Sequence, residues 1–172
     1  LIDTWVRKNS KKKFDHDGYL ASIGKKNEII FEQAQELYYN RNKEKKSFDT
    51  NDFDISFSRG LSLEDGTTTL TEFTGSIIAE TISLLAKNGK TFNNIIICGG
   101  GRKNKVLMDV IQKNLTLKTK INMIDDYGVN GDFVESKAFA FLAIRSYKKL
   151  PITFPSTTNC NEPCTGGKII EN

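Results

Sequence analysis

Residues 94–104 have the sequence NIIICGGGRKN, an apolar run followed by three glycines and the start of a helix. Glycine lacks a Cβ, so Gly99, Gly100 and Gly101 allow a tight backbone turn and the close approach of a ligand. A helix that begins after such a turn presents unpaired N–H groups and the positive end of its dipole. The segment predicts a strand–turn–helix unit that either contacts a nucleotide or is only a tight turn.

The glycine spacing narrows the kind of site. It matches neither the G-x-x-x-x-G-K-[ST] phosphate loop nor the G-x-G-x-x-G dinucleotide fingerprint, which argues against a Rossmann-type enzyme. Asn104 falls in the first helical turn, where its amide can bond a ribose, a base or the loop itself. Asp125 and Asp126 follow the next strand, so they are either ligand contacts or turn residues.

That next strand is expected at residues 118–124, after a helix that carries Val106, Leu107, Val110 and Ile111 on one side. Strand, helix and strand form a parallel, right-handed βαβ unit, so we predict an α/β fold. Residues 95–98 are apolar without alternation, which predicts a strand covered on both faces. Because two strands make a poor sheet, we expect further strands from preceding sequence or from another chain.

The composition is that of a globular protein, with 172 residues, 38% hydrophobic and 27% charged. A net charge of +4 is mild, and the lysine runs at 11–13 and 43–46 are typical of a solvated face, so we expect no nucleic-acid partner. No apolar run has the length of a membrane span. Three cysteines form no disulfide framework, which favours a reducing, cytoplasmic setting.

The chain begins inside an amphipathic pattern without an initiator methionine. Leu1, Ile2, Trp5 and Val6 share one helical face. We therefore expect this chain to be part of a longer protein and to form a single partial domain over residues 1–172.

Residues 11–60 are expected to be an irregular and helical insertion. His16 lies between two aspartates, so it is either a metal ligand or, as we favour, an exposed turn histidine. Asn27 is a candidate cap for a helix with Ile30, Ala34, Leu37 and Tyr38 on one face. Phe48, Phe53 and Phe57 are expected to anchor the polar stretch that follows.

The strongest helical pattern begins at Asp65 and ends at Asn88 and Gly89. Its apolar face is predicted to contain Leu70, Phe73, Ile77, Leu84 and Leu85. A run of threonines occupies its first turns, where β-branched residues are mediocre helix formers. These threonines face either a polar site or the solvent: Thr67, Thr68, Thr69 and Thr71.

A final helix is expected from Asp132 to Lys149, apolar nearly all round and therefore deeply buried. Glu135 faces Ala138, Phe139 and Leu142, where a carboxylate is costly unless it is paired or functional. Alternatively, Asp132 and Glu135 form a capping box. The tail, residues 151–172, is rich in Pro, Thr, Gly and Asn and is expected to wrap the surface.

Cys160 and Cys164 lie in this tail with C-x-x-x-C spacing. No further Cys or His is close enough in sequence to complete a metal site, so we predict no metal there.

Together these segments resemble the anhydro-N-acetylmuramic acid kinases of bacterial cell-wall recycling. The resemblance covers nearly the whole chain. It rests on LIDTW (1–5), DHDG (15–18), LEDGTTTLTEFT (63–74), CGGG (98–101) with Asn104 and Leu107-Met108, VESKAFAFLA (134–143), LP (150–151) and FPSTT (154–158).

The resemblance implies the C-terminal domain, RNase H-like, of a two-domain kinase in the actin/hexokinase superfamily. It also implies ATP- and Mg²⁺-dependent phosphorylation of 1,6-anhydro-N-acetylmuramic acid, with hydrolytic ring opening to N-acetylmuramate 6-phosphate, and a homodimer. Gly99, Gly100, Gly101 and Asn104 would then contact the adenosine side of ATP, and Glu135 the sugar.

Some features depart from the family. The G-T-S-x-D-G phosphate loop and the D-T-G-P-G-N segment with the catalytic aspartate do not occur in these 172 residues. Catalytic residues are therefore expected upstream, and this chain is expected to be inactive alone. Residues 49–53 stand where many members carry an S-T-G-R-E-like stretch, and the tail with Cys160 and Cys164 is atypical. The alternative function is a non-catalytic remnant or interaction module that retains part of a nucleotide pocket.

Overall fold

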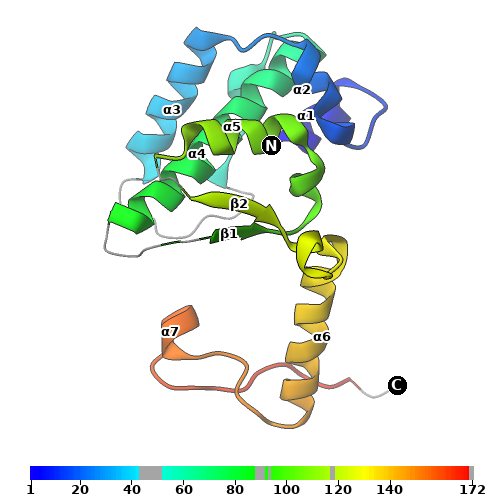
Figure 1. Cartoon of the computed structure of the whole chain (residues 1–172), viewed down its shortest axis with the longest axis vertical. Helices are drawn as coiled ribbons and strands as arrows, with labels where there is room; N and C mark the ends of the chain where they lie inside the picture. The colour runs from blue at the N-terminus through cyan, green and yellow to red at the C-terminus, as the bar shows by residue number, and fades with distance from the viewer. Residues whose placement is uncertain (43–51, 88–91, 93, 117–118, 171–172) are drawn as a thin grey trace. The chain divides into compact units, whose positions relative to one another are not determined.

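The computed structural model of the chain describes residues 1–42, 52–87, 92, 94–116 and 119–170. The described chain separates into two compact units, Leu1–Met123 and Ile124–Asn172. The first unit contains a small sheet and most of the helices, and the second is built around one long helix (Figure 1).

The first unit contains a two-stranded parallel sheet and its crossover helix. Strand β1 (Asn94–Ile97) pairs with β2 (Lys120–Met123), and Ile95 is the register partner of Ile121. Helix α5 (Lys105–Asn114) connects them. This arrangement confirms the predicted βαβ unit and the α/β class.

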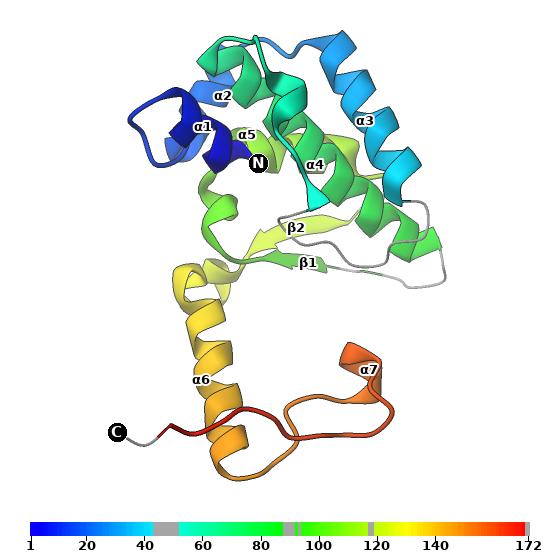
Figure 2. The same ribbon diagram turned by 180° about the vertical axis from the view of Figure 1, so that it is seen from behind.

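The helices of this unit lie on one side of the sheet in both views (Figures 1 and 2). They are α1 (Ile2–Asn9), α2 (Tyr19–Ile23), α3 (Glu28–Asn42), α4 (Leu63–Lys87) and α5. Ala79 of α4 packs with Leu107 and Ile111 of α5, and Ile121 of β2 packs against this cluster. Exposure alternates along β1, where the Ile96 side chain is 51% exposed. The prediction of a strand covered on both faces was therefore wrong.

Helix α4 packs against the other four described α-helices of the first unit, α1, α2, α3 and α5. Leu70, Phe73 and Ile77 are buried as predicted, but Leu84 is 50% exposed and Leu85 is also exposed. The helix begins at Leu63 rather than Asp65, because the Ser62 hydroxyl accepts a hydrogen bond from the Asp65 N–H at 3.0 Å. The helical periodicity therefore predicted the buried face of α4 correctly, but it extended this face too far toward the C-terminus of the helix.

The threonines of α4 are buried, which neither sequence-based interpretation anticipated. Thr67, Thr69 and Thr71 have no exposed surface, and each donates to the backbone carbonyl four residues earlier, at 2.7–2.8 Å. Because the helix satisfies each hydroxyl, only the methyl group must be packed. Thr69 also accepts a hydrogen bond from the Asn27 N–H at 3.0 Å, which attaches α4 to the start of α3.

The segment before α3 is also attached to α4 through a carboxylate. Asp65 accepts a hydrogen bond from the Lys25 N–H at 2.8 Å. This backbone donor, together with Ser62, lowers the pKa of Asp65.

The lowered pKa of Asp65 predicts a pH-dependent contribution to stability. Its folded-state pKa lies below the unfolded value of about 3.9, so the stabilisation is present above that pH and is lost as pH falls through the folded-state pKa. Between about pH 5 and pH 2, the free energy of unfolding should fall less in the Asp65→Asn variant than in the unsubstituted chain. Urea titration at each pH measures both free energies. Asp109→Asn, an exposed change on α5, is the control. Equal pH slopes for both variants would contradict the prediction.

The insertion around α3 contributes to the core. The Asn27 side chain accepts from the Ile30 N–H at 3.1 Å, so the predicted cap is confirmed. Ala34 packs with Phe73 and Ile77, and Phe53 and Phe57 lie against this cluster as predicted. Leu37, expected on the buried face, is exposed. Phe48 lies outside the described residues.

The second unit contains α6 (Val134–Tyr147) and the short α7 (Pro155–Thr158), preceded by 3₁₀ turns at Ile124–Tyr127 and Gly131–Phe133. No residue of α6 is buried, and Phe139 is 63% exposed. The prediction of a deeply buried helix was therefore wrong. An apolar helix is buried only if other elements cover it, and this unit supplies a four-residue helix and an irregular tail.

Candidate functional site

The glycine turn leaves β1 and leads into α5. Gly99 has φ 82° and ψ 172°, a conformation that favours glycine. A Cβ placed on Gly99 or Gly100 would meet no atom within 4 Å, so the space beside these two residues is open. The Arg102 guanidinium donates to the Gly99 carbonyl at 2.8 Å, which stabilises the turn. The turn therefore has the shape and the room for a ligand to approach its backbone.

Asn104 has a defined structural task at the end of this turn. It is the N-cap of α5, only 8% exposed, and its side-chain oxygen accepts from the Leu107 N–H at 3.0 Å. The sequence analysis considered a ribose, a base or the loop as partners, and the structure shows that this oxygen bonds the backbone of its own helix. A Cβ added to Gly18 would lie 2.4 Å from this side-chain oxygen of Asn104. The DHDG turn thus packs directly on the cap of α5.

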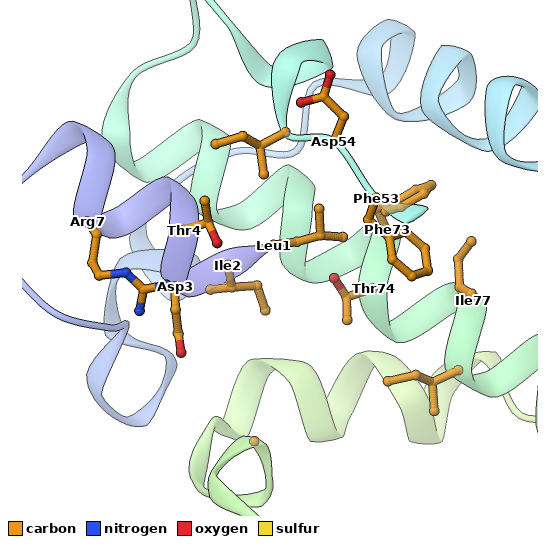
Figure 3. A pocket seen from close by; sticks show the side chains of 13 residues that line it. Leu1, Ile2, Asp3, Thr4, Arg7, Phe53, Asp54, Phe73, Thr74 and Ile77 are labelled. Atoms are coloured by element: carbon orange, nitrogen blue, oxygen red, sulfur yellow. The ribbon is translucent and has the colours of Figure 1, made fainter. Parts of the chain in front are cut away.

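A cavity of about 880 Å³ lies beside the glycine turn in the first unit. Its walls come from α1, α4, the segment around Phe53 and the turn residue Gly101 (Figure 3). The lining residues are Leu1, Ile2, Asp3, Thr4, Arg7, Phe53, Asp54, Ile55, Phe73, Thr74, Ile77, Ile78 and Gly101.

The chemistry of this cavity is mixed. Phe73 and Ile77 form an apolar wall, and Asp3 and Arg7 extend from α1 (Figure 3). Such a combination of apolar surface and a few charged groups is typical of small-molecule sites. Arg7 supplies donors for an anion, whereas the carboxylates of Asp3 and Asp54 accept from hydroxyl groups. Sequence analysis missed this cavity because four separate segments build it, and no local motif marks it.

The DHDG turn has a structural explanation. The Asp15 carboxylate is buried and accepts from the N–H groups of Leu20 at 2.7 Å and Ala21 at 3.1 Å, at the start of α2. His16 is exposed, as favoured from the sequence, and its Nδ1 lies 3.1 Å from a carboxylate oxygen of Asp17. Within the described residues, no group of three or more His, Cys, Asp or Glu side chains is placed to hold a metal ion.

Glu135 lies in the second unit, in the first turn of α6, and its side chain is exposed. The N-cap of α6 is Phe133, with no side-chain cap hydrogen bond, so the structure excludes the capping box of Asp132 and Glu135, one of the two alternatives that the sequence left open. Exposure also removes the predicted cost of a buried carboxylate. The other predicted site residues, Gly99, Gly100, Gly101 and Asn104, lie together in the first unit.

Comparison with known proteins identifies the family. A family sequence model described as anhydro-N-acetylmuramic acid kinase matches residues 1–172. The chain belongs to this family. It is 47% identical to the "Anhydro-N-acetylmuramic acid kinase" of Pelagibacter ubique over 175 residues, covering 100% of this chain and 46% of that relative. It is 35% identical to the protein of the same name from Zymomonas mobilis, covering 98% of this chain and 45% of the relative.

The family assignment confirms the resemblance seen in the sequence. A third relative with that name, from Caulobacter vibrioides, is 35% identical over 99% of this chain and 44% of its own length. The chain thus spans less than half the length of these curated relatives. In the part that the structure describes, no helix is both long and apolar enough to cross a membrane.

Proposed function

We propose that this chain is the C-terminal, RNase H-like part of a kinase that phosphorylates 1,6-anhydro-N-acetylmuramic acid with ATP. The proposed reaction also opens the anhydro ring by hydrolysis and gives N-acetylmuramate 6-phosphate. The match of the family to all 172 residues carries the proposal. The open glycine turn beside an 880 Å³ cavity supports it, because a kinase needs a concave site where backbone can meet a nucleotide.

The proposed roles follow from the local structure. The free space beside Gly99 and Gly100 admits the adenosine part of ATP close to the backbone. Asn104 maintains the turn by capping α5, so its contribution to nucleotide binding includes positioning the glycines. Glu135 is exposed and acceptor-only when ionised, which suits a sugar hydroxyl.

Mg²⁺ would be held mainly by the phosphates of ATP. This ion commonly uses one or two protein carboxylates together with substrate phosphates and water, rather than a dedicated protein cage. When bound, it neutralises charge on the transferring phosphoryl group.

Residues 1–172 alone are expected to bind nucleotide weakly and not to turn over. Phosphoryl transfer depends on groups positioned around the γ-phosphate. The phosphate-loop and catalytic-aspartate motifs of the family are not in this sequence. Robust ATP-dependent phosphorylation of the sugar by this chain alone would contradict that expectation.

A chimera provides the direct test. The matched segment of the Pelagibacter ubique relative, 47% identical, is replaced by this chain, and ATP-dependent phosphorylation of the anhydro sugar is measured. We expect activity. In the chimera, Gly99→Val should raise the KM for ATP about tenfold, equivalent to roughly 1.4 kcal/mol, because the side chain fills the approach to the turn.

Glu135 is tested in the same chimera. Glu135→Gln should lower kcat/KM for the sugar about tenfold and leave the KM for ATP unchanged. The neighbouring exposed change Ser136→Ala is the matched control. A folded chimera that binds ATP without turnover would favour the alternative function, a non-catalytic module that keeps part of a nucleotide pocket.

A further inference from the structure

The tail of the second unit brings two cysteines together around one threonine. The backbones of Thr153 and Cys164 form an antiparallel bridge, with the Thr153 N–H donating at 3.3 Å and the Cys164 N–H donating at 3.2 Å. In such a hydrogen-bonded pair the two side chains extend to the same face. The Cys160 thiol lies 3.9 Å from the Thr153 hydroxyl. Both sulfur atoms are therefore adjacent to the same side chain.

The turn between these residues holds Cys160 in place. Helix α7 ends at Thr158, and Asn159 has φ 57°, which reverses the chain so that Cys160 points back toward Thr153. The hydroxyl groups of Thr153 and Thr158 also contact each other beside the Cys160 sulfur. None of the three cysteines, Cys98, Cys160 and Cys164, is in a disulfide in this structure.

We infer that Cys160 and Cys164 form a reversible intramolecular disulfide, a redox modification site that is independent of the proposed kinase function. The reaction partner is a small disulfide such as oxidised glutathione. The Cys160 thiolate attacks one sulfur of glutathione disulfide, the S–S bond breaks, and one glutathione thiolate leaves. The deprotonated Cys164 then attacks the Cys160 sulfur and releases the second glutathione. The protein loses two hydrogens, and one disulfide is reduced to two thiols.

The surroundings assign different roles to the two thiols. The hydroxyl of Thr158 hydrogen-bonds the Cys160 sulfur and lowers the pKa of this thiol. Desolvation and the adjacent Cys160 raise the pKa of Cys164. A larger thiolate fraction makes Cys160 the attacking group and also the better leaving group during reduction. Cys164 is the resolving thiol.

The test uses the chain in glutathione buffers of increasing oxidised fraction, followed by alkylation, tryptic digestion and mass spectrometry. One tryptic peptide, residues 150–168, contains both cysteines, and Cys98 lies in another. We expect this peptide to lose two hydrogens and to escape alkylation, reversibly, under conditions where exposed Cys98 is still alkylated. Full alkylation at every ratio, or glutathione attached to both cysteines, would overturn the inference.

Variants separate the two roles. Cys160→Ser and Cys164→Ser should each abolish the internal disulfide, whereas Cys98→Ser should leave it unchanged. Thr158→Ala should slow disulfide formation about threefold by reducing the thiolate fraction of Cys160, with Ser156→Ala as the control. An unchanged rate in Thr158→Ala would overturn the assignment of Cys160 as the attacking thiol.

Discussion

Gly66→Ala is expected to destabilise the chain by about 2–3 kcal/mol, although alanine normally stabilises a helix relative to glycine by about 1 kcal/mol. Gly66 lies in α4 against the indole of Trp5. A Cβ on Gly66 would lie 2.3 Å from Cε2 and Cζ2 of that ring. The indole has little room to move, because Trp5 is only 4% exposed and its Nε1 donates to the Leu63 carbonyl at 3.0 Å. The added methyl group must therefore displace either the ring or α1.

The measurement is equilibrium unfolding in urea, followed by far-UV circular dichroism, because the control variants below lack tryptophan. Trp5 is the single tryptophan of the sequence, so its emission also reports displacement of the ring. A double-mutant cycle with Trp5→Phe provides the control, since phenylalanine has one ring instead of two and lacks part of the bulk to which Cε2 and Cζ2 belong. We expect Gly66→Ala to cost at least 1 kcal/mol less in the Trp5→Phe background, within the range of couplings between contacting residues of about 0.5–3 kcal/mol. Strictly additive effects would show that the ring contact is not the cause.

Local patterns were enough to predict much of the first unit. The βαβ unit follows from an apolar run, a glycine turn and a helix with Leu107, Val110 and Ile111 on one face, all of them buried. The cap at Asn27 is likewise determined by residues close in sequence. These features depend on hydrogen bonds and periodicities that a short segment satisfies by itself.

Burial was harder to predict, because it depends on what covers an element. Thr67 and Thr71 are fully buried, since a helical threonine bonds a carbonyl four residues earlier and then packs like a small apolar residue. Conversely, Phe139 and Phe141 of α6 are exposed despite their apolar side chains. The cavity beside Gly101 depends on segments that are distant in sequence, so neither its volume nor its lining was predictable.

The closeness of the DHDG turn to the glycine turn leads to a second large expected effect. Gly18→Ala should destabilise the chain by about 2–3 kcal/mol, from two sources. Gly18 has φ 78°, where a residue with a Cβ is strained. The new Cβ would also lie 2.4 Å from Oδ1 of Asn104, the atom that caps α5. The substitution therefore strains the DHDG turn and disrupts the start of the helix that follows the glycine turn.

Gly60→Ala separates these two sources. Gly60 also has a positive φ, 94°, but a Cβ there would meet no atom within 4 Å, so this variant should show only the backbone strain of about 1–2 kcal/mol. Asn104→Ala removes the crowded atom and should itself cost about 1 kcal/mol as the loss of a cap. In that background Gly18→Ala should cost less than in the unsubstituted chain, and it should exceed Gly60→Ala only through the remaining 3.1 Å approach to the Val106 backbone nitrogen. If Gly18→Ala is equally costly with and without Asn104, the close approach does not contribute, and the DHDG turn does not support the cap of α5. If the cost falls as expected, the DHDG turn and the glycine turn are energetically coupled through Asn104.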